Sequence, residues 1–207
     1  MSLAEFQRAL GDLIASPQHS AEMAARPQQA LSGYTLTSRE SRRLFLMARD
    51  ARMRMNCTLY RINRIIPIHS VLPRTCQRLG ASLGGVLDAY FVDEPDSTLQ
   101  YLLEAHRFAQ WLLTHPPSIE MSAAALRDLL TFELACHHVM SAPRLPPNAN
   151  HDDPRLCVVT LHHDIEDLLA DQTTAPQPLA APITLLLDAR GEALCVVPVE
   201  CEDATAH

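Results

Sequence analysis

The sequence has 207 residues, 47% of them hydrophobic, and a formal net charge of −7. This composition predicts a globular protein with a buried core, and no apolar run reaches the roughly 18 residues that a membrane helix needs. The six cysteines form no C-x-x-C pair, which disfavours a disulfide framework or a cysteine-based zinc site. Residues 1–13 include acids where a signal peptide is basic and then apolar, so we expect a cytoplasmic protein.

The first helices are predicted from capping patterns. Ser2 to Glu5 forms a capping box before an amphipathic stretch that ends ahead of Pro17. Thr37 to Glu40 forms a second capping box, which predicts one helix that starts near Ser38 and continues over residues 39–55.

Prolines and glycines divide the next part of the chain. Pro67 and Pro73 predict that residues 57–80 form two helical pieces, the second of which ends at Gly80. Further helices are expected over residues 82–92, 98–113 and 122–139, with Ser97 and Gln100 as a capping pair. The sequence therefore predicts an all-helical domain over residues 1–140.

The pattern changes after a segment with four prolines, residues 141–154, which predicts a linker. Three short β-branched runs and one short helix follow, so we expect an α+β protein whose residues 155–207 form a small β-α-β-β module. Ala189-Arg190-Gly191 suggests a three-residue hairpin loop with Gly191 at a positive φ. The run ITLLL is apolar on both faces and predicts a central strand, whereas Pro198 predicts that the last strand lies at an edge.

Charge is distributed unevenly along the chain. Residues 39–78 hold ten arginines against two acids, a local net charge of +8, whereas residues 145–207 hold eleven acids against two arginines, a local net charge of −9. Such segregation predicts two surfaces with different partners, or a basic and an acidic part that attract each other.

The arginine-rich helices of residues 39–78 allow an alternative interpretation, a nucleic-acid-binding regulator. The negative net charge and an aromatic content of 5% disfavour it, because phosphate is repelled and few rings can stack on bases. Arginine is also enriched at protein interfaces, where it binds carboxylates through two hydrogen bonds. We therefore expect a protein partner, and neither nucleic acid nor a membrane.

A free-standing metal-dependent enzyme is a second alternative, built on the histidine pairs His137-His138 and His162-His163 and on the cluster from His151 to Asp153. Adjacent histidines point in different directions on a helix or a strand, so neither pair can chelate one ion alone. The sequence has no G-x-S-x-G, P-loop or G-x-G-x-x-G motif. Metal ligation is therefore not expected.

Three motifs in order carry a resemblance to a known group of proteins. They are CTLYRINRIIPIHSVLPRTCQRLG at residues 57–80, AYFVDEP at 89–95 and HRFAQWLL at 106–113. Together they resemble the partner proteins that accompany multinuclear non-haem iron enzymes in peptide natural-product pathways, most of all those of methanobactin biosynthesis. The likeness spans most of the chain, because the β-α-β-β module also suits the C-terminal part of such partners.

The resemblance implies a heterodimer with a TIM-barrel iron enzyme of the MbnB type, and binding of a precursor peptide through its leader. The complex of that family oxidises precursor cysteines to oxazolone and thioamide groups. The iron ligands belong to the barrel subunit, so the resemblance implies no cofactor, metal ligand or catalytic residue in this chain. We therefore expect a non-catalytic accessory and recognition subunit.

Two sets of residues are the candidate binding sites. For the partner, we expect a docking surface on the proline-containing helices, formed by Arg54, Arg61, Asn63, Arg64 and Arg74. For the leader peptide, we expect strand addition beside the last β-prone run, at Ala193, Leu194, Cys195, Val196, Val197 and Val199.

Overall fold

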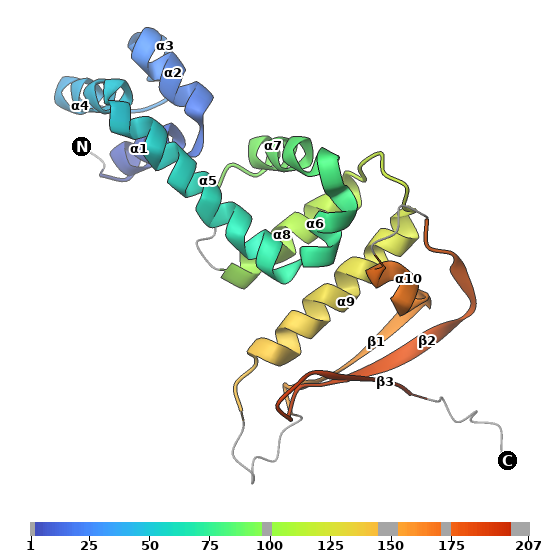
Figure 1. Cartoon of the computed structure of the whole chain (residues 1–207). Helices are drawn as coiled ribbons and strands as arrows, with labels where there is room; N and C mark the ends of the chain where they lie inside the picture. Colours follow the sequence, from blue (N-terminus) through green and yellow to red (C-terminus); the bar gives the residue numbers. More distant parts are fainter. Residues whose placement is uncertain (1–2, 97–100, 145–152, 171–174, 200–207) are drawn as a thin grey trace, which may run out of the picture. The chain divides into compact units, whose positions relative to one another are not determined.

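The computed structural model describes residues 3–96, 101–144, 153–170 and 175–199 (Figure 1). Contacts within the chain define two compact units. Unit 1 consists of Met1–Pro67 and Asp88–Glu104, and unit 2 consists of Ile68–Leu87 and Ala105–His207. Some helices contribute residues to both units: α5 (Ala51–Val71), α7 (Leu83–Asp93) and α8 (Tyr101–Thr114). Among the described residues, no helix is long and apolar enough to cross a bilayer.

Unit 1 is built from helices. Besides parts of α5, α7 and α8, it contains α1 (Leu3–Ala15), α2 (Pro17–Ala25), α3 (Pro27–Ala30) and α4 (Ser38–Arg49). Helices as short as α2 and α3 are unstable alone, so packing must hold them in place. Their unit has a core of apolar side chains from α1, α2, α4 and the beginning of α5: Ala9, Leu13, Met23, Leu44, Ala48, Met53 and Cys57.

The capping box predicted at the start of α4 is confirmed. Thr37 Oγ1 accepts the Glu40 N–H at 3.3 Å, and Glu40 Oε2 accepts the Thr37 N–H at 2.7 Å. The single helix expected over residues 39–55 is wrong, because the chain turns at Asp50, whose ψ of 131° is extended. Asp50 Oδ1 accepts the Arg52 N–H at 2.9 Å and so satisfies one of the amides that the start of α5 leaves free.

The two helical pieces expected over residues 57–80 are confirmed as the end of α5 and α6 (Pro73–Leu79), but the break between them lies before Pro73 and not at Pro67. Pro67 lies inside α5, which continues to Val71. A proline inside a helix costs about 3 kcal/mol or more, because it removes a hydrogen bond and crowds the preceding turn. Ile68 and Val71 just beyond it are buried, and their burial opposes that cost. Pro73, in contrast, starts α6, which ends as expected at Gly80 with φ +50°.

Unit 2 combines helices with a small sheet. A 3-10 turn (Gly80–Ser82) follows α6, and α9 (Ala123–Ser141) begins after Ser122, whose side chain accepts the Ala125 N–H. The remaining elements are β1 (Leu156–His163), α10 (Ile165–Leu169), β2 (Pro178–Asp188) and β3 (Cys195–Pro198). The strands are antiparallel in the order β1-β2-β3, so the α+β fold with a C-terminal β-α-β-β arrangement is confirmed.

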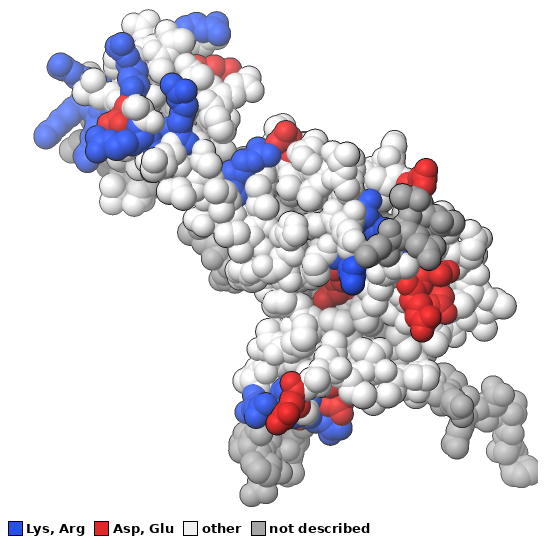
Figure 2. Space-filling view, viewed as in Figure 1, with Lys and Arg blue, Asp and Glu red and all other residues white. Residues whose placement is uncertain are grey.

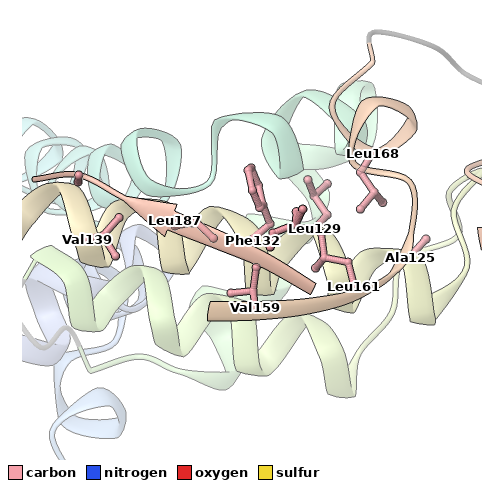
Figure 3. Close-up of a cluster of buried hydrophobic side chains, with 10 residues drawn as sticks. Ala125, Leu129, Phe132, Val139, Val159, Leu161, Leu168 and Leu187 are labelled. Carbon is pink, nitrogen blue, oxygen red and sulfur yellow. The ribbon is translucent and has the colours of Figure 1, made fainter. Parts of the chain in front are cut away.

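The core of unit 2 lies between α9 and one face of the sheet (Figure 3). Leu129 and Phe132 come from α9, and they pack with Val159 and Leu161 of β1 and Leu187 of β2. A sheet of three short strands needs such a partner layer to be stable. Because α9 and the sheet share this core, the compact unit that contains the sheet begins well before the proline-rich segment 141–154.

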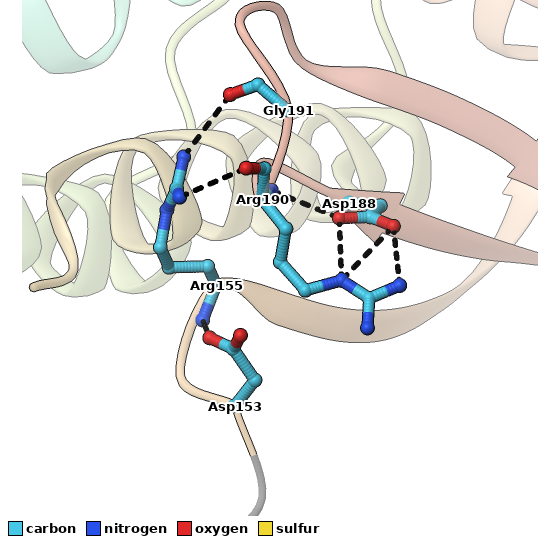
Figure 4. A network of polar contacts seen from close by, with 5 residues as sticks. All are labelled: Asp153, Arg155, Asp188, Arg190 and Gly191. Atoms are coloured by element: carbon cyan, nitrogen blue, oxygen red, sulfur yellow. Dashed lines mark hydrogen bonds and ion pairs between the residues drawn. The ribbon is translucent and has the colours of Figure 1, made fainter. Parts of the chain in front are cut away.

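The connection between β2 and β3 differs from the expected three-residue loop. β2 ends at Asp188 and β3 begins at Cys195, so six residues, 189–194, join them. Among the described glycines only Gly80 has a positive φ, so Gly191 does not make the expected turn. Instead, the Arg155 guanidinium donates to the carbonyls of Arg190 and Gly191 at 3.2 and 3.4 Å, and Asp188 pairs with Arg190 (Figure 4).

Other local predictions from the sequence are either confirmed or lie outside the described residues. The helices expected over 82–92 and 122–139 are confirmed as α7 and α9. Ser2, the capping pair Ser97 and Gln100, most of the linker, and His151 lie outside the described residues.

Candidate functional site

β3 is the edge strand that the sequence predicts, and β2 is the central strand. Within the described part of the chain β3 pairs only with β2, and its four residues are all exposed. The strand is shorter than expected, because Ala193 and Leu194 belong to the connection that precedes it. Its pairing extends one residue further, since Val199 donates its N–H to Thr184 O at 2.8 Å.

This hydrogen bond determines which backbone groups of β3 face the open side. In antiparallel pairs, hydrogen-bonded and non-hydrogen-bonded positions alternate. Val199 and Val197 therefore turn their backbone groups toward β2, whereas Val196 and Pro198 turn theirs toward the open edge. Pro198 has no N–H, so Val196 is the residue of β3 that offers both a donor and an acceptor there.

The side chains beside this edge form a continuous apolar row. Val158, Leu186 and Val197 are cross-strand neighbours on the face of the sheet opposite to α9. Val158 and Val197 are exposed, and Leu186 is half-buried. A strand added at β3 would extend this row by one position and bury part of it.

The opposite edge of the sheet is partly occupied. The Leu156 N–H donates to Asp153 O at 2.9 Å, and the His162 N–H donates to Asp128 Oδ2 at 2.6 Å. The Ala189 N–H donates to Arg155 O, so Arg155 is a position that bonds toward the neighbouring strand β2. Positions that bond toward β2 alternate with positions that face outward, and the amides of Leu156 and His162 therefore face away from β2. β1 therefore already uses two of its outward-facing donors within unit 2.

The arginine candidates for partner binding fall into different environments. Arg54 and Asn63 are exposed on α5. Arg61 is paired with Asp88 at the surface, and its guanidinium lies over the ring of Phe91. Figure 2 shows that exposed arginines gather over α4 and the beginning of α5; they are Arg39, Arg42, Arg43, Arg49, Arg52 and Arg54.

Arg64 does not lie on the docking surface that the sequence predicts. It is 2% exposed, so it cannot present its guanidinium to a partner. Arg64 Nε donates to Glu104 Oε1 at 2.6 Å, and the guanidinium lies 4.6 Å from the ring centre of Phe91. The Tyr90 hydroxyl donates to the same Glu104 oxygen at 3.1 Å. Burial, and then the Glu104 charge, raise the pKa of Tyr90.

Arg74 donates hydrogen bonds from both its backbone N–H and its side chain. Its N–H donates to Glu133 Oε1 at 2.6 Å, and the neighbouring Thr75 donates both its N–H and its hydroxyl to Glu133 Oε2 at 2.9 and 2.6 Å. The buried Glu133 of α9 thus caps the start of α6. The Arg74 guanidinium donates to Gln77 Oε1 at 2.8 Å at the surface. Its side chain remains accessible to a partner, but its backbone is structural.

The histidine pair on β1 is split between two environments. His163 is buried, with Nδ1 2.8 Å from Asp128 Oδ2, whereas His162 is exposed. Burial opposes ionisation of Asp128, but hydrogen bonds from His163 and His162 lower its pKa below the usual value. In the described ranges, no three or more His, Cys, Asp or Glu side chains are grouped to hold a metal ion.

Two buried or half-buried cysteines of unit 2, Cys76 and Cys136, are poor nucleophiles. Burial, and then the charge of Glu133, raise the pKa values of Cys76 and Cys136 to about 12. These thiols therefore stay protonated at neutral pH, and a thiolate is the form that reacts.

Acids on the buried stripes of helices were missed in the sequence. Glu104, Asp128 and Glu133 lie on helices whose neighbouring buried positions are apolar. The signal that could have found them is a single carboxylate in helical register with leucines and phenylalanines, because such a group needs a buried partner.

A comparison with known protein families, curated proteins and solved structures finds no match to the chain.

Proposed function

We propose that this chain is the non-catalytic accessory and recognition subunit of an iron-dependent oxidative complex, as in methanobactin biosynthesis. It acts in the cytoplasm as a heterodimer with a TIM-barrel iron enzyme of the MbnB type. That enzyme holds the iron and converts cysteines of the precursor peptide to oxazolone and thioamide groups. The chain itself holds the leader of the precursor, which adds as a strand to β3.

The observation that carries this proposal is the open edge of β3. Strand addition draws its affinity from main-chain hydrogen bonds, which make few demands on the peptide sequence. Val196 supplies a donor and an acceptor on the open side, and Pro198 supplies one further carbonyl. The side chains of Val197 and Val199 lie on the apolar face beside it. The order of the three sequence motifs supports the identity of the complex.

Val196→Pro is expected to weaken binding of the leader at least about 10-fold, because it removes the backbone donor at the centre of the added strand. Val196→Ala is the matched control, since it keeps the N–H and removes only part of the side chain. Fluorescence anisotropy with the labelled leader of the cognate precursor measures both variants. Unchanged binding by Val196→Pro would mean that the leader does not pair with β3.

Hydrogen exchange on the wild-type chain identifies the edge directly. The leader should slow exchange at the Val196 amide, which faces the open side, and leave Leu156 to His162 unaffected. Protection confined to Leu156–His163 would assign the leader to β1 instead.

The heterodimer is tested by size-exclusion chromatography of the chain mixed with the iron enzyme. The two proteins should elute as one complex, and two separate peaks at micromolar concentration would contradict the proposed heterodimer.

A further inference from the structure

The long helix α5 has two apolar faces. One face packs in the core of unit 1 through Met53 and Cys57, which are almost completely buried. The opposite face carries four large apolar side chains that remain exposed to solvent. Met55 is 64% exposed, Leu59 51%, Ile62 42% and Ile66 46%.

These four residues follow one another at intervals of four, three and four positions. That spacing is the repeat of the apolar seam in a coiled coil, where every second contact lies one heptad further along. The seam runs over three turns of helix, about 16 Å at 1.5 Å per residue. Single exposed apolar residues need no explanation, but a contiguous row of this length indicates an interaction surface.

The charges around this row indicate the chemistry of its partner. α5 contains four arginines and no aspartate or glutamate. Three acids that contact the beginning or the length of α5 already have arginine partners: Asp50 with Arg52, Asp88 with Arg61 and Glu104 with Arg64. Within the described ranges no carboxylate pairs with Arg54, nor with Arg39 and Arg42 of the preceding helix. A second copy of α5 would bring arginines against arginines, whereas an acidic helix would satisfy them.

We propose that the row formed by Met55, Leu59, Ile62 and Ile66 docks an acidic amphipathic helix of another protein. The apolar seam of that helix packs on the row, and its flanking carboxylates face the arginines of α4 and α5. Assigning the helix to the iron enzyme rests on the proposed function, but the chemistry of the contact does not. The surface belongs to unit 1, whereas β3 belongs to unit 2.

Two designed peptides test this surface without the iron enzyme. Both are about three heptads long with leucine at the seam positions; one carries glutamate and the other lysine at the flanking positions, and like charges keep each from pairing with itself. The full chain should bind the glutamate peptide at least about 30-fold more tightly than the lysine peptide, measured by fluorescence anisotropy.

Substitutions then locate the contact. Leu59→Asp combined with Ile62→Asp should weaken binding of the glutamate peptide at least about 30-fold, as expected for residues at the centre of an interface. Val92→Asp is the control, because Val92 is an exposed apolar residue, 77% accessible, on another helix of the same unit. Circular dichroism checks that both variants retain their helices, which is expected because these side chains are exposed.

Several outcomes would overturn the proposal. Equal binding of the two peptides, or unchanged binding of the glutamate peptide to the double variant, would contradict it. A concentration-dependent dimer of the chain that the double variant abolishes would make a second copy of the chain the occupant. Displacement of the glutamate peptide by a short DNA duplex would assign the arginines to nucleic acid. If the peptide binds as expected but the iron enzyme does not, the surface stands and the proposed heterodimer fails.

Discussion

Replacing Glu104 with alanine is expected to lower the free energy of unfolding by about 3–5 kcal/mol, because it leaves Arg64 charged and buried without its partner. Both side chains of this pair are almost inaccessible, and they are joined at 2.6 Å. The substitution also removes the acceptor of the Tyr90 hydroxyl. Urea unfolding followed by circular dichroism measures the change.

The same helix supplies the control for this prediction. Arg61 pairs with Asp88 one turn earlier on α5, but both side chains are well exposed. Arg61→Ala should therefore cost less than about 1 kcal/mol. Comparable losses for Glu104→Ala and Arg61→Ala would show that the Arg64 pair is not buried. The double variant Arg64→Met with Glu104→Leu should recover most of the stability, since it removes both charges together.

Replacing Glu133 with alanine is expected to cost about 3 kcal/mol, because two backbone amides at the start of α6 lose the buried carboxylate that accepts their hydrogen bonds. Thr75 is completely buried, so water cannot easily replace the carboxylate. Ser122→Ala is the matched control, since Ser122 caps α9 at an exposed position, and it should cost about 1 kcal/mol. Equal losses in thermal unfolding for the two caps would contradict this account.

Glu133 also predicts a pH dependence of stability. Burial raises the pKa of Glu133 above its usual value of 4.5, although hydrogen bonds from Thr75 and Arg74 lower it in part. A carboxyl with a raised pKa binds protons more tightly in the folded state than in the unfolded state. Its contribution to stability therefore falls as the pH rises from 4.5 through the raised pKa.

The Glu133→Gln variant isolates this effect. It has no titrating group at position 133, so the free energy of unfolding of the wild type minus that of Glu133→Gln should decrease as the pH rises from 4.5 and then become constant. A difference that increases with pH over that range would show that the pKa of Glu133 is lowered, not raised.

Local signals in the sequence were sufficient for the class of fold and for much of its layout. The capping box of Thr37 and Glu40, the C-cap at Gly80 and the start of α6 at Pro73 are interactions between residues close in the chain. The apolar run of β2 and the proline of β3 predicted the central and edge strands, because strand position depends on burial and on the N–H that proline lacks.

The tertiary structure decided the environment of residues whose interaction partners are distant in the sequence. Pro67 remains in a helix because residues beyond it are buried, and Arg64 became internal because Glu104 and Tyr90 meet it from elsewhere in the sequence. The connection to β3 is held by Arg155 and not by Gly191. The sequence by itself determined where α4 and α6 begin, which strand is central and which is an edge, since these depend on neighbours in the chain. Only the tertiary structure decided which charges are buried, because a buried charge needs a partner, and the partner's position is a property of the whole fold.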